Sequence, residues 1–111
     1  MPKHVIISEL GGPEVLHYKD YDLPNEIKDK EVRIKHSSIG LNYIDTYHRS
    51  GIYPLPSQLP VCPGMEAAGV VIGIGSEVRN FKIGDRVAYA TPPIGAYCDI
   101  RDFPEERLMS I

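Results

Sequence analysis

The sequence of 111 residues has no tryptophan, only two cysteines and no apolar run long enough to span a membrane. Two cysteines are too few for the disulfide framework of a small secreted domain. The formal net charge is −3, so the basic excess typical of nucleic-acid-binding domains is also missing. These absences argue against a nucleic-acid partner and a membrane span. The first ten residues lack the apolar segment of a signal peptide, and we expect a cytoplasmic protein with free thiols.

Glycine and proline, in contrast, are abundant, with ten of each. They divide the chain into short segments, a pattern typical of β-strands joined by tight turns. Residues 31–39 alternate apolar and polar side chains, as a half-buried strand does. Residues 67–75 are small or apolar throughout, and we expect a strand buried on both faces. The patterns predict a mainly β domain, a partly open β-barrel with one or two short helices.

The clearest helical signal is the segment NYIDTYHRSG, residues 42–51. Asn42 can cap its amino end, and Gly51 can end it. Tyr43 and Tyr47 are four residues apart, so they lie on one face of the helix. Tyrosines at such positions more often pack against other side chains than bind a ligand.

Three other patterns have both a chemical and a simpler explanation. Residues 73–78, GIGSEV, begin like a dinucleotide-binding loop, but the third glycine and the following helix are missing, so we interpret them as a β-turn. Cys62 and Cys98 are far apart in the sequence and form no zinc motif. Asp45 and His48 offer an acid–base pair, but side chains at this spacing more often lie on a solvated helix face.

Five longer motifs follow one another along the chain: GGPEVL, IGLNYIDTYHRSGIYP, PGMEAAGVV, VRNFKIGDRVAYA and GAYCDI. Together they resemble the N-terminal domain of the zinc-free quinone oxidoreductases, the zeta-crystallin-like branch of the medium-chain dehydrogenase/reductase superfamily. The resemblance covers almost the whole chain. It implies one GroES-like, partly open β-barrel over residues 1–111, and an oxidoreductase that reduces quinones with NADPH.

The resemblance also implies a domain that works without zinc. Zinc-dependent relatives carry a histidine ligand where this chain has Met65 and a cysteine ligand where it has Asn42, and their four-cysteine zinc loop is missing. A thioether and an amide do not replace imidazole and thiolate as zinc ligands. Glu66 then has no metal to support. We expect it to be a buried carboxylate paired with an arginine, for which Arg86 is a candidate, or with backbone N–H groups, so that Glu66→Ala costs about 3–5 kcal/mol of stability.

The resemblance also implies the site residues. It places six residues near the nicotinamide and ribose of NADPH: Asn42, Tyr43, Ile44, Asp45, Thr46 and Tyr47. Tyr53 would line the quinone pocket. No catalytic acid or base is implied, because the cofactor carries the redox chemistry and a quinone can take protons from water.

The chain ends at Ile111, where proteins of this family continue into a Rossmann domain that holds the cofactor. We therefore expect a truncated domain that is inactive alone, with a separately encoded Rossmann domain as a candidate partner. Two alternatives remain open: a GroES-like interaction module that uses the segment GIYPLPSQLPV as a mobile loop, and a degenerate remnant without activity. The oxidoreductase motifs favour the first interpretation. A homo-oligomer is left open.

Overall fold

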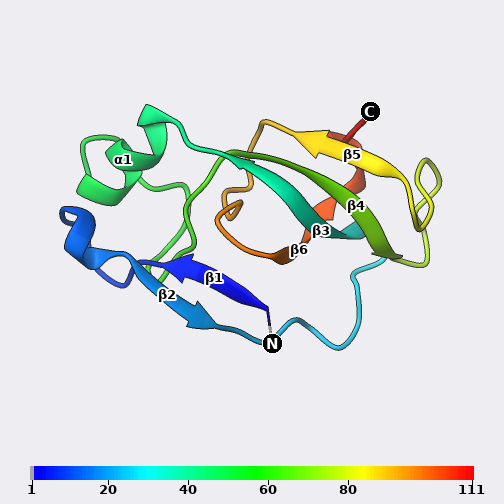
Figure 1. Ribbon diagram of the computed structural model, residues 1–111, viewed down its shortest axis with the longest axis horizontal. Coiled ribbons are helices and arrows are strands. Elements are labelled where there is room, and N and C mark those ends of the chain that lie inside the picture. Colours follow the sequence, from blue (N-terminus) through cyan, green and yellow to red (C-terminus); the bar gives the residue numbers. More distant parts are fainter. Residues whose placement is uncertain (1) are drawn as a thin grey trace.

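Two antiparallel sheets form the fold of the computed structural model, which describes residues 2–111 (Figure 1). The larger sheet has the strand order β6-β3-β4-β5-β7, and β1 pairs with β2 in the smaller one. The strands are β1 (Lys3–Ile6), β2 (His17–Asp20), β3 (Glu31–Gly40), β4 (Glu66–Ile74), β5 (Arg86–Tyr89), β6 (Ile100–Pro104) and β7 (Met109–Ser110). The sheets do not close into a full barrel. The predicted mainly β, partly open, GroES-like barrel is therefore confirmed.

Helix α1 (Tyr43–Ser50) lies where residues 42–51 predict a helix. Asn42 is its N-cap, and Gly51 ends it in the left-handed conformation, with φ 89°, which glycine adopts at little steric cost. Two short 3₁₀ helices accompany it, η1 (Pro13–Val15) and η2 (Glu105–Arg107). No helix within residues 2–111 meets the length and hydropathy that a membrane crossing requires.

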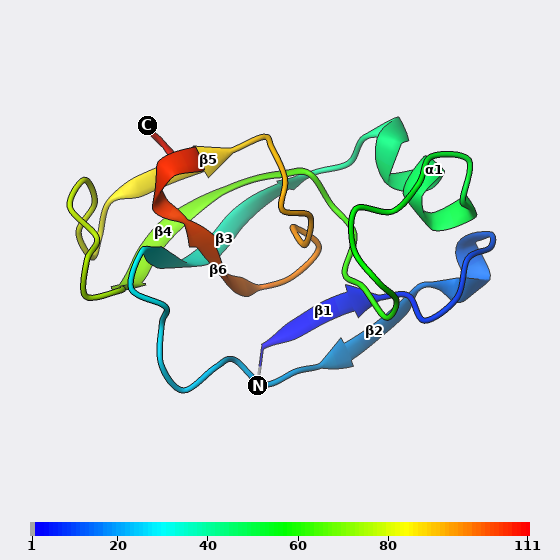
Figure 2. The same ribbon diagram turned by 180° about the vertical axis from the view of Figure 1, so that it is seen from behind.

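The main hydrophobic core lies on one face of the larger sheet. Tyr89 of β5 and Phe103 of β6 stack with ring centroids 4.1 Å apart at its centre. A second, smaller cluster connects the β1–β2 pair to the segment that precedes β4. There Ile7 and Val61 exchange two backbone hydrogen bonds of 2.9 Å and bury their side chains together. This second cluster joins the smaller sheet to the rest of the fold, and Figure 2 shows α1 beyond that end of β1.

Strand β4 differs from the prediction of burial on both faces. Ala67, Gly69 and Val71 are buried, whereas Ile72 and Ile74 are 41% and 38% exposed. Antiparallel sheets commonly leave one face open to solvent, and the small residues of this strand hide the alternation in the sequence. The prediction of a strand buried on both faces was therefore wrong.

The segment GIGSEV is a turn and not a nucleotide-binding loop, which confirms that interpretation. Strand β4 ends at Ile74, and no helix follows it before β5. The N–H of Gly75 donates to the carbonyl of Glu31 over 2.8 Å. A Cβ atom at Gly75 would overlap the carbonyl oxygens of Lys28 and Asp29, so close backbone packing explains this glycine.

Candidate functional site

Helix α1 follows β3 directly, and its amino end lies beside the start of β4. Gly40 at the end of β3 pairs with Glu66 at the start of β4. The side-chain amide of Asn42 donates to Oε1 of Glu66 over 3.2 Å, and the backbone N–H of Asn42 donates to Oδ2 of Asp45 over 3.1 Å. The sheet thereby fixes where the first turn of α1 begins.

Asp45 connects the helix to the loop between β5 and β6. Its side chain is only 3% exposed, and Oδ2 also accepts a hydrogen bond from the hydroxyl of Tyr97 over 2.6 Å. Burial, together with this bond to Asp45, raises the pKa of Tyr97. The carboxylate therefore serves as an anchor between α1 and the loop.

His48 is also 3% exposed, so the expectation of a solvated helix face for Asp45 and His48 was wrong. This face of α1 packs inward, and the ring of His48 meets the ring of Tyr53 edge-on with centroids 5.7 Å apart. No hydrogen bond joins Asp45 to His48 within residues 2–111. Asp45 Oδ1 and His48 Nδ1 are each buried without a partner in that range. The geometry shows no acid–base pair here.

Three tyrosines gather on the outside of α1. Tyr43 is 82% exposed, Tyr47 41% and Tyr53 54%. Tyr43 and Tyr47 share a helix face, and the N–H of Tyr53 donates to the carbonyl of Tyr47 over 3.2 Å. Ile44 and Thr46 are half-buried, and the Thr46 hydroxyl donates to the Tyr43 carbonyl over 2.7 Å. The seven residues expected at the site therefore lie together, with the tyrosines outside and Asp45 inside.

Glu66 does not pair with Arg86, so that expectation was wrong. Arg86 is exposed and pairs in the sheet with Val70, four residues along β4 from Glu66. Glu66 is half-buried, and its hydrogen-bond partner is the amide of Asn42. A Cβ atom at Gly40 would overlap the Glu66 carboxylate, so glycine at this position leaves room for the contact.

The substitution Glu66→Ala is therefore expected to cost about 1 kcal/mol of stability, well below the cost of breaking a buried ion pair. Removing the carboxylate leaves only one amide group without its partner, at a half-buried position. Urea unfolding of the wild type and the variant measures the difference. Glu77→Ala, at an exposed position, is the matched control. A loss of 3 kcal/mol or more would restore the buried-pair interpretation.

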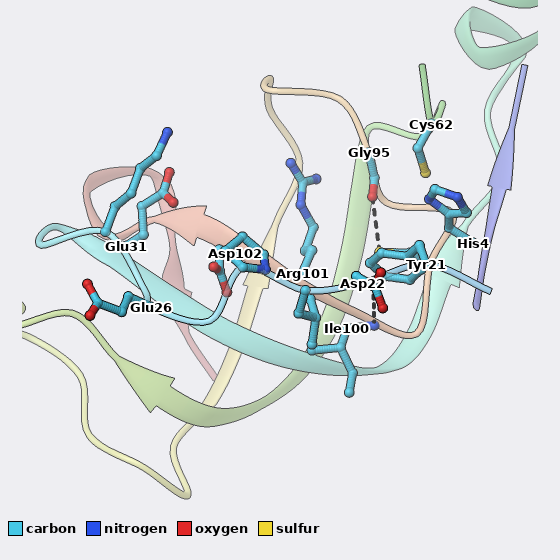
Figure 3. A pocket seen from close by; sticks show the side chains of 14 residues that line it. His4, Tyr21, Asp22, Glu26, Glu31, Cys62, Gly95, Ile100, Arg101 and Asp102 are labelled. Carbon is cyan, nitrogen blue, oxygen red and sulfur yellow. Dashed lines mark hydrogen bonds between the residues drawn. The ribbon is translucent and has the colours of Figure 1, made fainter. Parts of the chain in front are cut away.

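The structure also brings together two cysteines that the sequence spacing separates. Cys62 and Cys98 line one pocket of about 410 Å³, together with His4, Tyr21 and Arg101 (Figure 3). No local signal reveals this pair, because the pairing of distant segments creates it.

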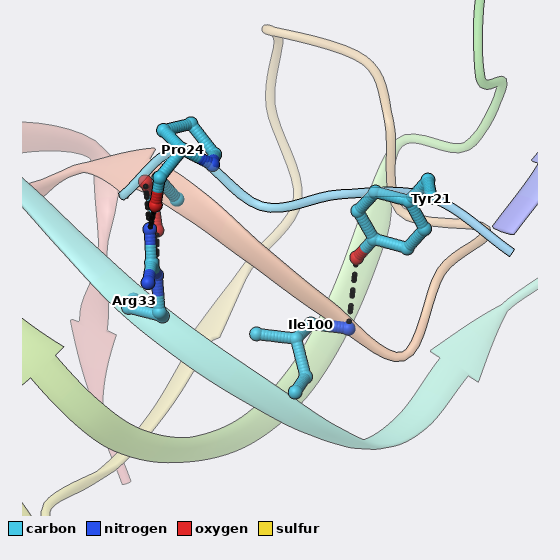
Figure 4. Close-up of polar contacts among 5 residues, drawn as sticks. Tyr21, Pro24, Arg33 and Ile100 are labelled. Carbon is cyan, nitrogen blue, oxygen red and sulfur yellow. Dashed lines mark hydrogen bonds and ion pairs between the residues drawn. The ribbon is translucent and has the colours of Figure 1, made fainter. Parts of the chain in front are cut away.

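Segment 21–24 forms a wall of this pocket, and polar contacts hold it against the larger sheet (Figure 4). Arg33 donates from Nη2 to the carbonyl of Pro24 over 2.7 Å and from Nε to Asp102 over 2.8 Å. The N–H of Ile100 donates to the hydroxyl of Tyr21 over 3.3 Å. The pocket is thus bounded by fixed side chains.

Known proteins match this chain in sequence and in fold. The alcohol dehydrogenase GroES-like domain family matches residues 28–108. A quinone oxidoreductase of Pseudomonas aeruginosa is 52% identical over all 111 residues, which cover 34% of that protein. The solved quinone oxidoreductase of Pseudomonas syringae pv. Tomato DC3000 is 49% identical with a TM-score of 0.92, over 100% of this chain and 34% of that one. The Escherichia coli quinone oxidoreductase complexed with NADPH is 38% identical with a TM-score of 0.92, over 98% and 33%.

The chain spans about a third of the length of the curated relatives it matches. The resemblance to the N-terminal part of quinone oxidoreductases is confirmed by these matches. The family match also includes α1, β3 and β4, the elements that carry Asn42 and Glu66. By sequence and fold together, the chain belongs to the alcohol dehydrogenase GroES-like domain family.

Proposed function

We propose that this chain is the substrate-side domain of an NADPH-dependent quinone oxidoreductase, in which a Rossmann domain supplies the opposite wall of the cleft. The observation that carries the proposal is the 52% identity over all 111 residues to a protein named quinone oxidoreductase. The solved relative complexed with NADPH has the same fold, which supports NADPH as the cofactor. This domain would be encoded either in the same polypeptide as the Rossmann domain or separately.

The exposed tyrosines of α1 and of the segment that follows it fit this role. Tyr43, Tyr47 and Tyr53 present a large aromatic surface with polar hydroxyls, and such a patch suits a flat ring that needs both stacking and hydrogen bonds. Bound NADPH supplies the reducing equivalents for the quinone. Asn42, Tyr43 and Tyr47 would orient the nicotinamide, and Tyr53 would line the quinone pocket.

The remaining residues of the motif would shape the site and position α1 without contacting the cofactor. Ile44 and Thr46 are half-buried and flank the helix face that carries Tyr43 and Tyr47. Asp45 would contact no ligand directly, because its carboxylate is buried against Tyr97. It would hold α1 at the orientation in which the tyrosines face the cleft. The cofactor contacts of the family motif would therefore belong to Asn42, Tyr43 and Tyr47, with Asp45 as a positioning residue.

Amide chemical shifts of the ¹⁵N-labelled chain test this placement. NADPH and reduced nicotinamide mononucleotide are expected to shift the amides of residues 42–47, with a Kd of about 1 mM or weaker, because one wall of a cleft gives little affinity. Adenosine 2′,5′-bisphosphate is the matched control, since it carries the adenine half and no nicotinamide. Shifts caused only by that control, or confined to another face, would overturn the placement.

The proposal also includes a zinc-free domain. Met65 packs against the cluster of Ile7 and Val61, and the Asn42 amide donates to Glu66, which supports this part of the proposal. Within residues 2–111, no three or more His, Cys, Asp or Glu side chains are grouped for a metal ion.

Protein purified without added metal is expected to hold well under one equivalent of zinc per chain. Elemental analysis measures the content, with a zinc-dependent dehydrogenase purified in parallel as the positive control. About one zinc per chain, retained through dialysis against a chelator, would contradict the zinc-free assignment.

A further inference from the structure

Two segments far apart in the sequence bring Cys62 and Cys98 close to each other. Residues 62–64 precede β4, and residues 95–98 lie between β5 and β6. The N–H of Tyr97 donates to the carbonyl of Pro63 over 3.0 Å, and the N–H of Ala96 donates to the carbonyl of Gly64 over 3.3 Å. These contacts bring Cys98, the residue after Tyr97, close to Cys62, the residue before Pro63.

The two cysteines are neighbours across adjoining segments. Cys62 directly precedes Pro63 and Cys98 directly follows Tyr97, and Pro63 and Tyr97 share a hydrogen bond. Cys98 itself pairs with His4 in an isolated antiparallel bridge. A disulfide needs Cα atoms roughly 4.4–6.8 Å apart. Both cysteines are free thiols in this structure.

The thiols also share one polar environment. Cys62 Sγ lies 3.4 Å from the carbonyl of Tyr97, and Cys98 Sγ lies 3.2 Å from the carbonyl of Gly95. Cys98 is 6% exposed and Cys62 is half-buried, and both line the pocket of about 410 Å³. Figure 3 shows Cys62, His4 and Tyr21 gathered at one end of this pocket. A small oxidant can enter through it.

The two thiols differ in acidity in a way that assigns their roles. The neighbouring Cys62 thiol, followed by His36, lowers the pKa of Cys98 although burial opposes the shift. The Nδ1 atom of His36 lies 3.8 Å from Cys98 Sγ. The contact with Cys98, together with burial, raises the pKa of Cys62. This difference in pKa, with His36 beside Cys98, favours Cys98 as the nucleophile and Cys62 as the thiol that resolves it.

We propose that Cys98 and Cys62 form an oxidation site at which a hydroperoxide produces an intrachain disulfide. The Cys98 thiolate attacks one oxygen of the hydroperoxide, the O–O bond breaks, and Cys98 becomes a sulfenic acid while hydroxide or alkoxide leaves. The Cys62 sulfur then attacks the Cys98 sulfur, forming the S–S bond and releasing water. The two thiols lose two electrons in total, and the hydroperoxide gains them.

Peptide mapping after hydrogen peroxide treatment tests the proposal. The chain, treated with a small excess of peroxide and then alkylated, is expected to lose about 2 Da and to resist alkylation at both cysteines. Trypsin places Cys62 in residues 50–79 and Cys98 in residues 87–101, so the disulfide joins two separate peptides. Dithiothreitol is expected to release them. Absence of the joined peptide, or cysteines joined only between chains, would overturn the proposal.

Two single variants separate the roles of the thiols. In Cys62→Ser, Cys98 sulfenic acid has no partner and is expected to be trapped by dimedone. In Cys98→Ser, dimedone labelling of Cys62 is expected to be at least about tenfold slower, because burial still raises the pKa of Cys62 after its contact with Cys98 is lost. Equal labelling in the two variants, each shown to be folded by circular dichroism, would overturn the assignment of Cys98 as the nucleophile. The joined peptide of the wild type decides the disulfide itself even where a variant does not fold.

Discussion

The 111-residue chain, given NADPH and tetramethyl-1,4-benzoquinone, is expected to show no turnover above a protein-free control. The pyrophosphate of a dinucleotide needs backbone N–H groups at a helix amino end behind a glycine-rich turn. Within residues 2–111 the one α-helix is α1, and the Asp45 carboxylate already occupies its first turn. The turn that follows Gly75 leads into no helix before β5.

A nicotinamide held against one wall also remains in water, without the orientation that makes electron transfer efficient. The loss of absorbance by the reduced nicotinamide, followed with and without protein, measures the rate. The fully methylated quinone is chosen because it has no free ring position for thiol addition at Cys62 or Cys98. Sustained turnover proportional to protein concentration would reveal a cofactor site that α1 and its neighbours do not explain.

The substitution Asp45→Ala is expected to lower the free energy of unfolding by about 3 kcal/mol. It removes a buried carboxylate that accepts hydrogen bonds from the Tyr97 hydroxyl and the Asn42 N–H. Both donors then lose their acceptor, and the space left by the side chain adds to the cost. Urea unfolding followed by circular dichroism measures the loss.

Two further variants serve as comparisons for the stability loss of Asp45→Ala. Tyr97→Phe breaks only one of the two bonds to Asp45, so it should cost less than Asp45→Ala, about 1–2 kcal/mol. Glu106→Ala, at an exposed position, should change stability by no more than about 0.5 kcal/mol. A loss below about 1 kcal/mol for Asp45→Ala would show that this carboxylate does not anchor α1 to the loop.

Local signals were sufficient to predict α1 and the alternation of β3. The cap Asn42 and the terminal Gly51 act within one turn of the helix, so neighbouring residues in the sequence contain the information. Val32 and Ile34 are buried as their alternation with charged residues predicts. In β4, by contrast, the residues are small or apolar on both faces, and the sequence does not show which face meets solvent.

The features that sequence reasoning missed depend on strand register and on distant packing. The partner of Glu66 follows from strand pairing. The pairing of β3 with β4 places Asn42 within reach of Glu66, whereas Arg86 of β5 lies beside Val70, four residues further along β4. The burial of Asp45 follows from a loop more than fifty residues further along the chain. The pairing of Cys62 with Cys98 likewise depends on two segments that meet only in the folded protein.

The most direct test of the proposed function is a chimera in which these 111 residues replace the corresponding part of the Pseudomonas aeruginosa quinone oxidoreductase. The identity of 52% makes the exchange conservative, and the corresponding segment of the Escherichia coli relative provides a matched control graft. NADPH-dependent reduction of tetramethyl-1,4-benzoquinone is expected at a kcat/KM within about tenfold of the parent enzyme. Tyr53→Ala in the chimera should raise the KM for the quinone and leave NADPH affinity unchanged. A folded chimera that binds NADPH but reduces the quinone about a thousandfold more slowly than the control graft would contradict the proposed function.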